Sequence, residues 1–244
     1  MTEQLTTPGA GAHGGSSKTT TKVTRALLAC GVVAGPLYIL LALLQLLFRD
    51  GFDLSRHPLS LLSLGELGWI QITNFVIAGL LAVAFAVGLR RVLYPGRGGT
   101  WGPRLLGGYG LGLIAGGIFV ADPALGFPPG TPDSIPDQFS WHGTLHAFAP
   151  PLASLSLIAA CFVLTRRFAA SGHRGWVAYS ITTAVACLAL SAWPDQDTVS
   201  VRLVVAVVIG WAWVSVLAAR LLADPAAITG SVAPEIQAEE GWPC

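Results

Sequence analysis

The stretch WIQITNFVIAGLLAVAFAVGLRR, residues 69–91, is the clearest structural signal in this chain. It contains no charged side chain before Arg90 and Arg91 at its end. A helix needs about 20 predominantly apolar residues to cross the hydrocarbon core of a bilayer, and this stretch supplies them. It therefore predicts a transmembrane helix with a basic boundary at one end.

The chain contains five further apolar runs of similar length. Together with the run at 69–93, the six runs have the approximate bounds 26–48, 69–93, 104–121, 141–164, 175–193 and 200–222. Charged residues make up 11% of the chain, whereas a soluble domain carries about 25%. We therefore predict an all-α polytopic membrane bundle of six transmembrane helices over residues 25–222. The flanking segments, 1–24 and 223–244, are predicted to be disordered tails.

The basic residues are distributed unevenly between the predicted loops. Eleven Lys and Arg lie on the side of the two termini, and three, Arg49, Arg56 and Arg202, lie on the other side. The positive-inside rule then predicts a multi-pass protein of the cell membrane with both termini in the cytoplasm. The net charge of +1 favours no nucleic-acid partner, so the lipid bilayer is the partner we expect.

The fourth run opens with SWHGTLHAFAPP, residues 140–151, which is an unusual start for a membrane helix. His142 and His146 are four residues apart, so they share one helix face. Pro150 and Pro151 lack the N–H groups that would bond to the carbonyls of residues 146 and 147. The segment therefore predicts two imidazoles above unpaired carbonyls at the outer end of the helix.

Other polar residues fall on the same predicted side and complete a candidate pocket. Its members are His57, Ser60, Asp122, His142, His146 and Asp195. Two imidazoles at this spacing can bind one metal ion, and a carboxylate can be a third ligand. We therefore consider a zinc site on His142, His146 and Asp122. The alternatives are a proton-linked or ligand-binding site without metal, and histidines with a structural role only.

Small residues recur every four positions in the second and third runs. They are Gly108, Gly112 and Gly116 in one, and Ala78, Ala82 and Ala86 in the other. Such stripes are typical of close helix contacts in membranes. Before the second run, Pro58 followed by alternating leucines and serines predicts a short helix. Five prolines between residues 121 and 140 predict a stiff third loop.

Three segments together resemble a known family. HPLSLLSLGELGWIQITNFVIAGLLAVAFAVGLRR at 57–91, GIFVADP at 117–123 and WHGTLH at 141–146 are similar to the bacterial and archaeal membrane family DUF998. The resemblance extends over roughly residues 25–222. It implies a six-helix membrane protein and carries no defined reaction, so it supports the fold and assigns no catalytic residue.

Two functional hypotheses follow. In the first, the chain is an integral membrane protein of unknown specific activity, whose outer His/Asp pocket binds a metal and hydrolyses a lipid-like substrate. In the second, the same pocket serves a non-enzymatic membrane partner protein or a small transporter. The apolar helix centres argue against the translocation of ions or sugars, because such pathways need intramembrane polar groups.

Overall fold

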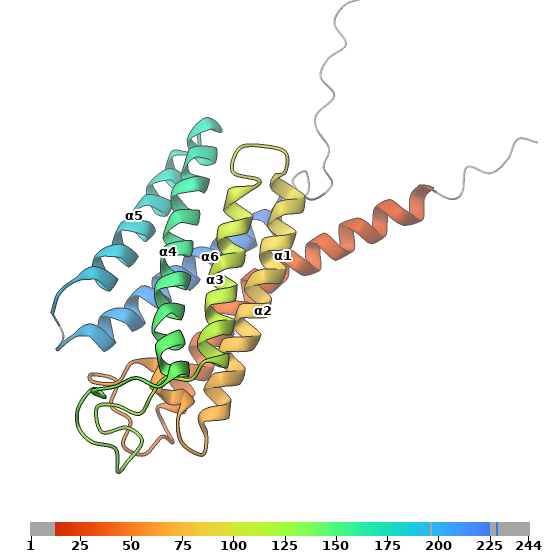
Figure 1. Cartoon of the computed structure of the whole chain (residues 1–244). Coiled ribbons are helices and arrows are strands. Elements are labelled where there is room, and N and C mark those ends of the chain that lie inside the picture. Colours follow the sequence, from red (N-terminus) through yellow and green to blue (C-terminus); the bar gives the residue numbers. More distant parts are fainter. Residues whose placement is uncertain (1–12, 196, 225–227, 229–244) are drawn as a thin grey trace, which may run out of the picture.

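The structure is a computed structural model, and it describes residues 13–195, 197–224 and 228. Within these residues the chain forms six α-helices, one short 3₁₀ helix and no β-strand (Figure 1). The elements are α1 (His13–Gln45), η1 (Leu59–Ser63), α2 (Gly68–Leu93), α3 (Trp101–Ile118), α4 (Trp141–Ala170), α5 (Arg174–Ala192) and α6 (Val199–Ala223). The first helix begins at His13, ahead of the apolar run. The domain boundaries at 24/25 and 222/223 stay predictions, because half of the N-terminal tail and most of the C-terminal tail lie outside the described residues.

Five of the six helices, α1, α2, α4, α5 and α6, are long and apolar enough to cross a membrane. α3 is the exception because seven of its 18 residues are glycine and it carries Arg104. Glycine adds little hydrophobicity, but α3 lies between α2 and α4 (Figure 1). A helix enclosed in this way needs less apolar surface than one that faces lipid on several sides.

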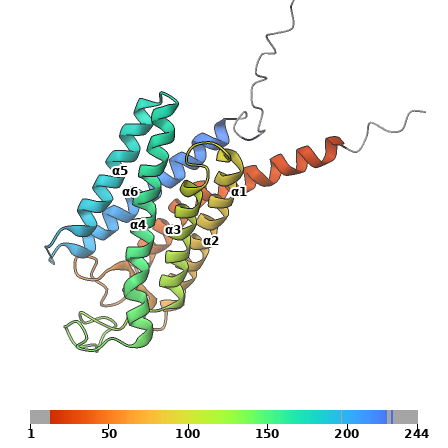
Figure 2. The same cartoon turned by 45° about the horizontal axis from the view of Figure 1, so that its top comes forward.

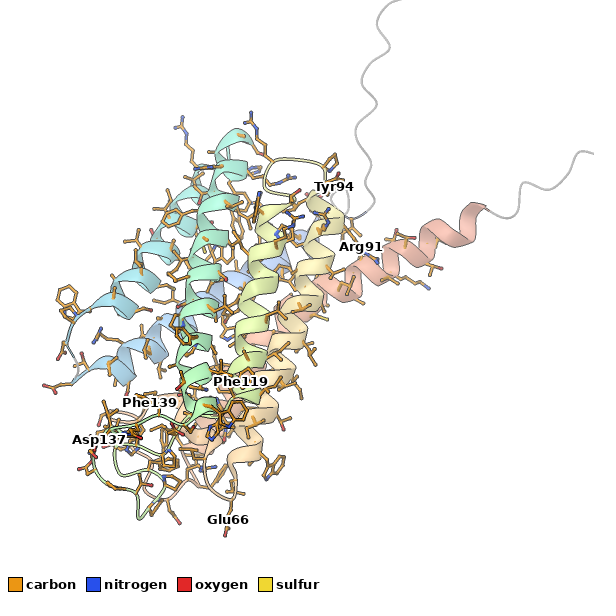
Figure 3. All side chains as sticks on the ribbon, viewed as in Figure 1. Glu66, Arg91, Tyr94, Phe119, Asp137 and Phe139 are labelled. Carbon is orange, nitrogen blue, oxygen red and sulfur yellow. The ribbon has the colours of Figure 1, made fainter. Side chains whose placement is uncertain are left out.

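The helices run up and down, so their connections gather at two ends of the bundle (Figures 1 and 2). Residues 46–67, 119–140 and 193–198 connect helices at one end, which we call the loop end. Residues 94–100 and 171–173 connect them at the other, which we call the arginine end. Figure 3 labels Glu66 and Asp137 at the loop end and Arg91 at the arginine end. The charge asymmetry expected from the sequence thus separates the two ends of the folded chain.

The glycines of α3 bring two neighbouring helices close to its backbone. A Cβ added to Gly112 would lie 2.8 Å from the backbone nitrogen of Ala153 on α4. A Cβ added to Gly110 would lie 2.6 Å from the carbonyl oxygen of Gly79 on α2. The predicted glycine stripe therefore packs against α4, and a second set of glycines, which the four-residue spacing did not reveal, packs against α2.

A buried polar network joins α1 to α2 near the loop end. The amide of Gln45 donates to Gln71 Oε1 at 2.8 Å, and the amide of Asn74 donates to the Tyr38 carbonyl at 3.0 Å. All four residues are buried. From the sequence, Gln71 and Asn74 could have bonded between helices or remained at headgroup depth. These bonds between helices pair both amide N–H groups, as burial requires, whereas Gln45 Oε1 and Asn74 Oδ1 have no partner among the described residues.

Candidate functional site

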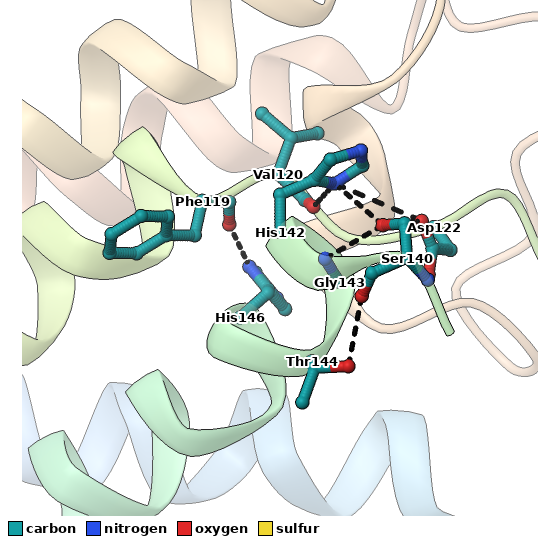
Figure 4. Close-up of polar contacts among 8 residues, drawn as sticks. All are labelled: Phe119, Val120, Asp122, Ser140, His142, Gly143, Thr144 and His146. Carbon is teal, nitrogen blue, oxygen red and sulfur yellow. Dashed lines mark hydrogen bonds and ion pairs between the residues drawn. The ribbon is translucent and has the colours of Figure 1, made fainter. Parts of the chain in front are cut away.

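Asp122 holds the start of α4 (Figure 4). Its two carboxylate oxygens accept hydrogen bonds from the backbone N–H of Ser140 at 2.7 Å and from the Ser140 hydroxyl at 2.6 Å. Ser140 Oγ in turn accepts the N–H of Gly143 at 3.0 Å, as an N-cap does. A Cβ at residue 143 would collide with the carboxylate, so glycine is needed there. Asp122 therefore has a structural role in this arrangement.

His142 lies beside this cap and faces partly outward. Its Nδ1 is 2.9 Å from the carbonyl oxygen of Val120 and 3.0 Å from Ser140 Oγ. Because a carbonyl can only accept, Nδ1 carries the proton. The same nitrogen is 3.8 Å from Asp122 Oδ1, and the side chain of His142 is 41% exposed. Its Nε2 is thus left for solvent or a ligand.

His146, one turn further along α4, is buried and only half satisfied. Its Nδ1 is 2.6 Å from the carbonyl oxygen of Phe119, so this nitrogen also carries the proton (Figure 4). The residue is 6% exposed. Its Nε2 has no hydrogen-bond partner within the described part of the chain. A neutral imidazole at this position therefore presents an unpaired acceptor inside the protein.

His57 differs from His146 because both of its ring nitrogens are bonded. Nδ1 accepts the backbone N–H of Asp53 at 2.9 Å, so Nε2 carries the proton and donates to the Leu125 carbonyl at 2.9 Å. The ring is 2% exposed and packs against Phe52 and Phe127 at centroid distances of 5.3 and 5.5 Å. In this structure His57 joins the first loop to the third and has no free nitrogen for a metal or substrate.

Further contacts fasten these two loops to each other. Arg56 forms an ion pair with Asp133, and the guanidinium of Arg49 lies 5.3 Å from the Phe127 ring centroid. Partial burial lowers the pKa of the Arg49 side chain from its ordinary value. Ser200 at the start of α6 donates to the carbonyl of Arg56 at 2.8 Å. The first and third loops are therefore packed into one layer over the loop end.

Asp195 belongs to a separate turn between α5 and α6. Its carboxylate accepts hydrogen bonds from the Thr198 hydroxyl and from the backbone N–H of Asp197. These bonds, that of Thr198 first, hold its pKa below the ordinary value. Arg202 donates to the carbonyl of the same residue. The side chain of Asp195 thus bonds within the turn that precedes α6, and its carbonyl bonds to Arg202 of that helix.

A cavity of about 530 Å³ lies below the loop end, between α3, α4, α5 and α6, and reaches α1 and η1. Its walls are mainly apolar, with polar atoms contributed by Ser60, Tyr109, His146, Ser191 and Trp211, among others. The indole N–H of Trp211, like Nε2 of His146, has no partner among the described residues. Two residues that line this cavity, His146 and Trp211, therefore each have a buried ring nitrogen without a partner among the described residues.

The structure brings together some of the residues singled out from the sequence and keeps others apart. Asp122 and His142 meet through Ser140, His146 follows them on α4, and Ser60 shares the cavity with His146. Within the described residues, no three His, Cys, Asp or Glu side chains form a group that could hold a metal ion. The zinc site stays a prediction, and the bonds of the Asp122 carboxylate to Ser140 leave that side chain poorly suited to be the third ligand.

Trp211 is the cavity residue that sequence reasoning missed. It lies in the apolar run of α6, where a tryptophan away from the helix ends looks like an ordinary core residue. The one available signal was its position: tryptophans concentrate at the membrane interfaces, whereas Trp211 lies near the middle of its helix. Sequence spacing could not indicate that Trp211 and His146 line the same cavity, because α4 and α6 are far apart in sequence.

Comparison with known proteins gives one match. No curated protein and no solved structure matches the chain. A family model described as "Protein of unknown function (DUF998)" matches residues 32–220, from the middle of α1 to the last turn of α6. The match includes α2 to α5 in full, parts of α1 and α6, the layer of loops and the residues that line the larger cavity. The chain is therefore an integral membrane protein of the DUF998 family.

Proposed function

We propose that this protein binds a lipid-like amphiphile in the cavity between α3, α4, α5 and α6. The observation that carries the proposal is that His146, whose buried Nε2 has no partner among the described residues, lines a mainly apolar cavity of about 530 Å³. Ligand sites for small molecules have volumes of roughly 300–1,000 Å³, with mostly apolar walls and a few polar groups. A buried polar group without a partner costs about 1–3 kcal/mol, so a ligand that pairs with it recovers that energy.

The hydrogen bond of His146 Nδ1 selects the polar group of the ligand. Since Nδ1 donates to the Phe119 carbonyl, Nε2 is an acceptor in the neutral ring. The carbonyls of His146 and Ala147 lack their usual helical donors because Pro150 and Pro151 have no N–H. All of these groups accept hydrogen bonds. The ligand should therefore carry a donor, such as a hydroxyl or an amide.

The length of the cavity suits an extended apolar chain. Leu157 on α4 contacts the position of Gly210 on α6, next to Trp211. Leu157 is eleven residues beyond His146, or roughly 16 Å at a rise of about 1.5 Å per residue. The indole N–H of Trp211 would then meet the inner part of the ligand, where an acceptor such as a carbonyl oxygen would satisfy it.

Entry from the bilayer is supported by the outer wall of the cavity. Leu155 on α4 and Leu188 on α5 line the cavity, yet their side chains are 58% and 45% exposed. On a membrane bundle such leucines face lipid. A chain from the bilayer can therefore reach the cavity between α4 and α5 without crossing the layer of loops.

The orientation in the membrane is part of the same proposal. The arginine end carries Arg90 and Arg91 at the end of α2, Arg167 on α4 and Arg220 on α6. This supports cytoplasmic termini in the cell membrane, by the positive-inside rule. The cavity would then take a ligand from the outer half of the bilayer.

Lipid hydrolysis at a zinc ion is a narrower hypothesis for the same region. The observation that favours it is that His142 and His146 each hold Nδ1–H on a backbone carbonyl, as metal-ligand histidines commonly do. Elemental analysis of the purified protein tests it. One zinc per chain that is lost in His142→Ala and His146→Ala would support the metal site, and its absence from metal-supplemented protein would exclude it.

Binding is tested with a fluorescent long-chain alcohol added to the purified protein in nanodiscs. His146→Ala should weaken binding roughly threefold to tenfold, the value of one hydrogen bond. Ala147→Trp should reduce it further, because Ala147 is an exposed residue at the wall of the cavity, where a large ring blocks access at little risk to folding.

His142→Ala is the matched control. It removes an imidazole one turn away on the same helix, but His142 does not line the cavity. The control should bind the alcohol as the unmodified chain does. Equal binding by all four proteins would contradict the proposal. A partner protein or transporter would instead show unchanged alcohol binding together with a co-purifying chain or transported solute.

A further inference from the structure

A second cavity, of about 240 Å³, lies at the arginine end, where α2, α4 and α6 finish. Its apolar floor comes from side chains such as Leu93, Leu164 and Leu217. Its rim contains Arg167 from the last turn of α4 and Arg220 from the last turn of α6. Two guanidinium groups from different helices thus border one small cavity, at the opposite end of the bundle from His146.

Arg220 is held in place without using its hydrogen-bond donors. Its guanidinium carbon lies 4.6 Å from the ring centroid of Trp176 and 5.6 Å from that of Phe168. Within the described residues its guanidinium forms no ion pair and donates no hydrogen bond. A guanidinium has five N–H donors in a planar fork. Stacking therefore orients the group, while its donors stay available to a ligand.

Arg167 is fixed in a different way. Its Nη1 donates to the carbonyl of Arg97 at 3.1 Å and approaches that of Leu93 at 3.5 Å. These bonds tie the loop after α2 to α4 and partly neutralise carbonyls near the end of α2. They occupy one nitrogen of the guanidinium. Arg167 too has no carboxylate partner among the residues that the structure describes.

The other ionisable groups of this cavity are His173 and Asp224. His173 lies in the exposed turn between α4 and α5. Asp224 has an interaction of its own, so it is not a free counter-charge. Two arginines against one engaged carboxylate leave an excess of positive charge around the cavity. An anion compensates that excess better than a neutral ligand does.

We propose that this cavity binds the phosphate group of an anionic phospholipid. Arginine matches phosphate geometry with paired N–H donors, and basic pockets between the ends of transmembrane helices bind lipid headgroups. The ends of helices that cross the hydrocarbon core reach the headgroup region, and the apolar side chains of the cavity can accept the first carbons of an acyl chain. The end of a helix favours cations, which explains the presence of arginine there but not the unused donors of Arg220.

The test uses dioleoyl phosphatidylglycerol titrated onto the detergent-purified full chain, with bound lipid counted by native mass spectrometry. Arg220→Gln and Arg167→Gln should each weaken binding roughly fivefold, the effect of about one basic residue near the membrane surface. Arg220→Lys keeps the charge but loses the planar fork, so its affinity for the lipid should lie between that of the unmodified chain and that of Arg220→Gln. Arg220→Lys also retains the stem that packs on Trp176, which guards against a folding defect.

Arg166→Gln is the matched control, since Arg166 precedes Arg167 on α4, is exposed and does not line the cavity. It should bind phosphatidylglycerol as the unmodified chain does. Equal losses in Arg166→Gln and Arg220→Gln would overturn the proposal in favour of a diffuse basic surface. An inorganic phosphate arm distinguishes the source. Resistance of lipid binding to millimolar phosphate supports a lipid site, and displacement by phosphate alone would overturn the lipid assignment.

Discussion

The α2–α3 contact and the α5 side of the same bundle are packed in opposite ways. Gly79 and Gly110 bring the backbones of α2 and α3 so close that a Cβ on either would lie 2.6 Å from the carbonyl of the other. Half of the residues in the apolar window of α2 are buried, but only 22% of those in α5. The main packing partners of α5 are α4 and α6, and the large cavity lies on this side.

This difference separates a rigid part of the bundle from a part that can accept a ligand. Close contact between the α2 and α3 backbones leaves no room for a ligand, because closely packed protein interiors have few voids. The α5 side retains a cavity with an unpaired acceptor on His146 and an unpaired donor on Trp211. Such unsatisfied groups weaken a fold, whereas the close α2–α3 contact favours stability.

The largest expected effect comes from breaking the tight side. Gly110→Ala places a methyl group 2.6 Å from the Gly79 carbonyl and 2.9 Å from Val83, so α2 and α3 must separate. We expect a loss of stability of about 2–3 kcal/mol, measured by thermal unfolding in detergent. Gly107→Ala is the control on the same helix, since its Cβ would have its nearest neighbour at 4.0 Å. It should be neutral or stabilise by about 0.5–1 kcal/mol, and equal losses in both variants would refute the comparison.

An intermediate effect on stability is expected at the start of α4, the helix that packs against α3 on one side and α5 on the other. Ser140→Ala removes the N-cap oxygen and the hydroxyl that binds Asp122, at a cost of about 1 kcal/mol. Thr144→Ala, which removes an exposed hydroxyl one turn later, should cost less than 0.5 kcal/mol. Urea unfolding of both variants checks this order. If Ser140→Ala is as stable as the unmodified chain, the cap does not anchor the cavity side.

The smallest effect is expected in the α5–α6 turn, and it depends on pH. Hydrogen bonds hold the pKa of Asp195 below its ordinary value of 3.8, so its ionised form stabilises the folded state. This contribution is present above pH 3.8 and is lost as the pH falls through the lower folded pKa. The stability difference between the unmodified chain and Asp195→Asn should therefore shrink below pH 3.8. Asp197→Asn should keep the profile of the unmodified chain, and a pH-independent difference for Asp195→Asn would contradict this explanation.

The helices were largely predictable from local composition. The run at 69–93 corresponds to α2 (Gly68–Leu93), and the run at 175–193 to α5 (Arg174–Ala192). The short helix expected after Pro58 is present as η1, although as a 3₁₀ helix whose Leu61 and Leu62 are buried. The membrane prediction is confirmed for five helices. α3 shows where composition misleads, because its glycines suit contact with neighbouring helices more than contact with lipid.

The candidate site was predicted less completely. The i, i+4 spacing of His142 and His146 indicated a shared helix face, and the two do lie on successive turns of α4. Spacing could not indicate that His57 uses both ring nitrogens in loop contacts while His146 leaves one unpaired. Nor could it indicate that the Asp195 carboxylate would bond within its own turn. Each of these outcomes depends on which backbone carbonyl or N–H lies next to the side chain.

The sequence by itself determined the helical class, the helix positions and the two charged ends, because hydrophobicity and charge act over short stretches of chain. Only the tertiary structure decided which histidine is free, which glycines touch which helix, and where the cavities lie. His57 meets a carbonyl 68 residues away, and His146 meets one 27 residues away. Contacts across such separations arise when the helices pack, and they set the hydrogen bonding and burial from which the function is proposed.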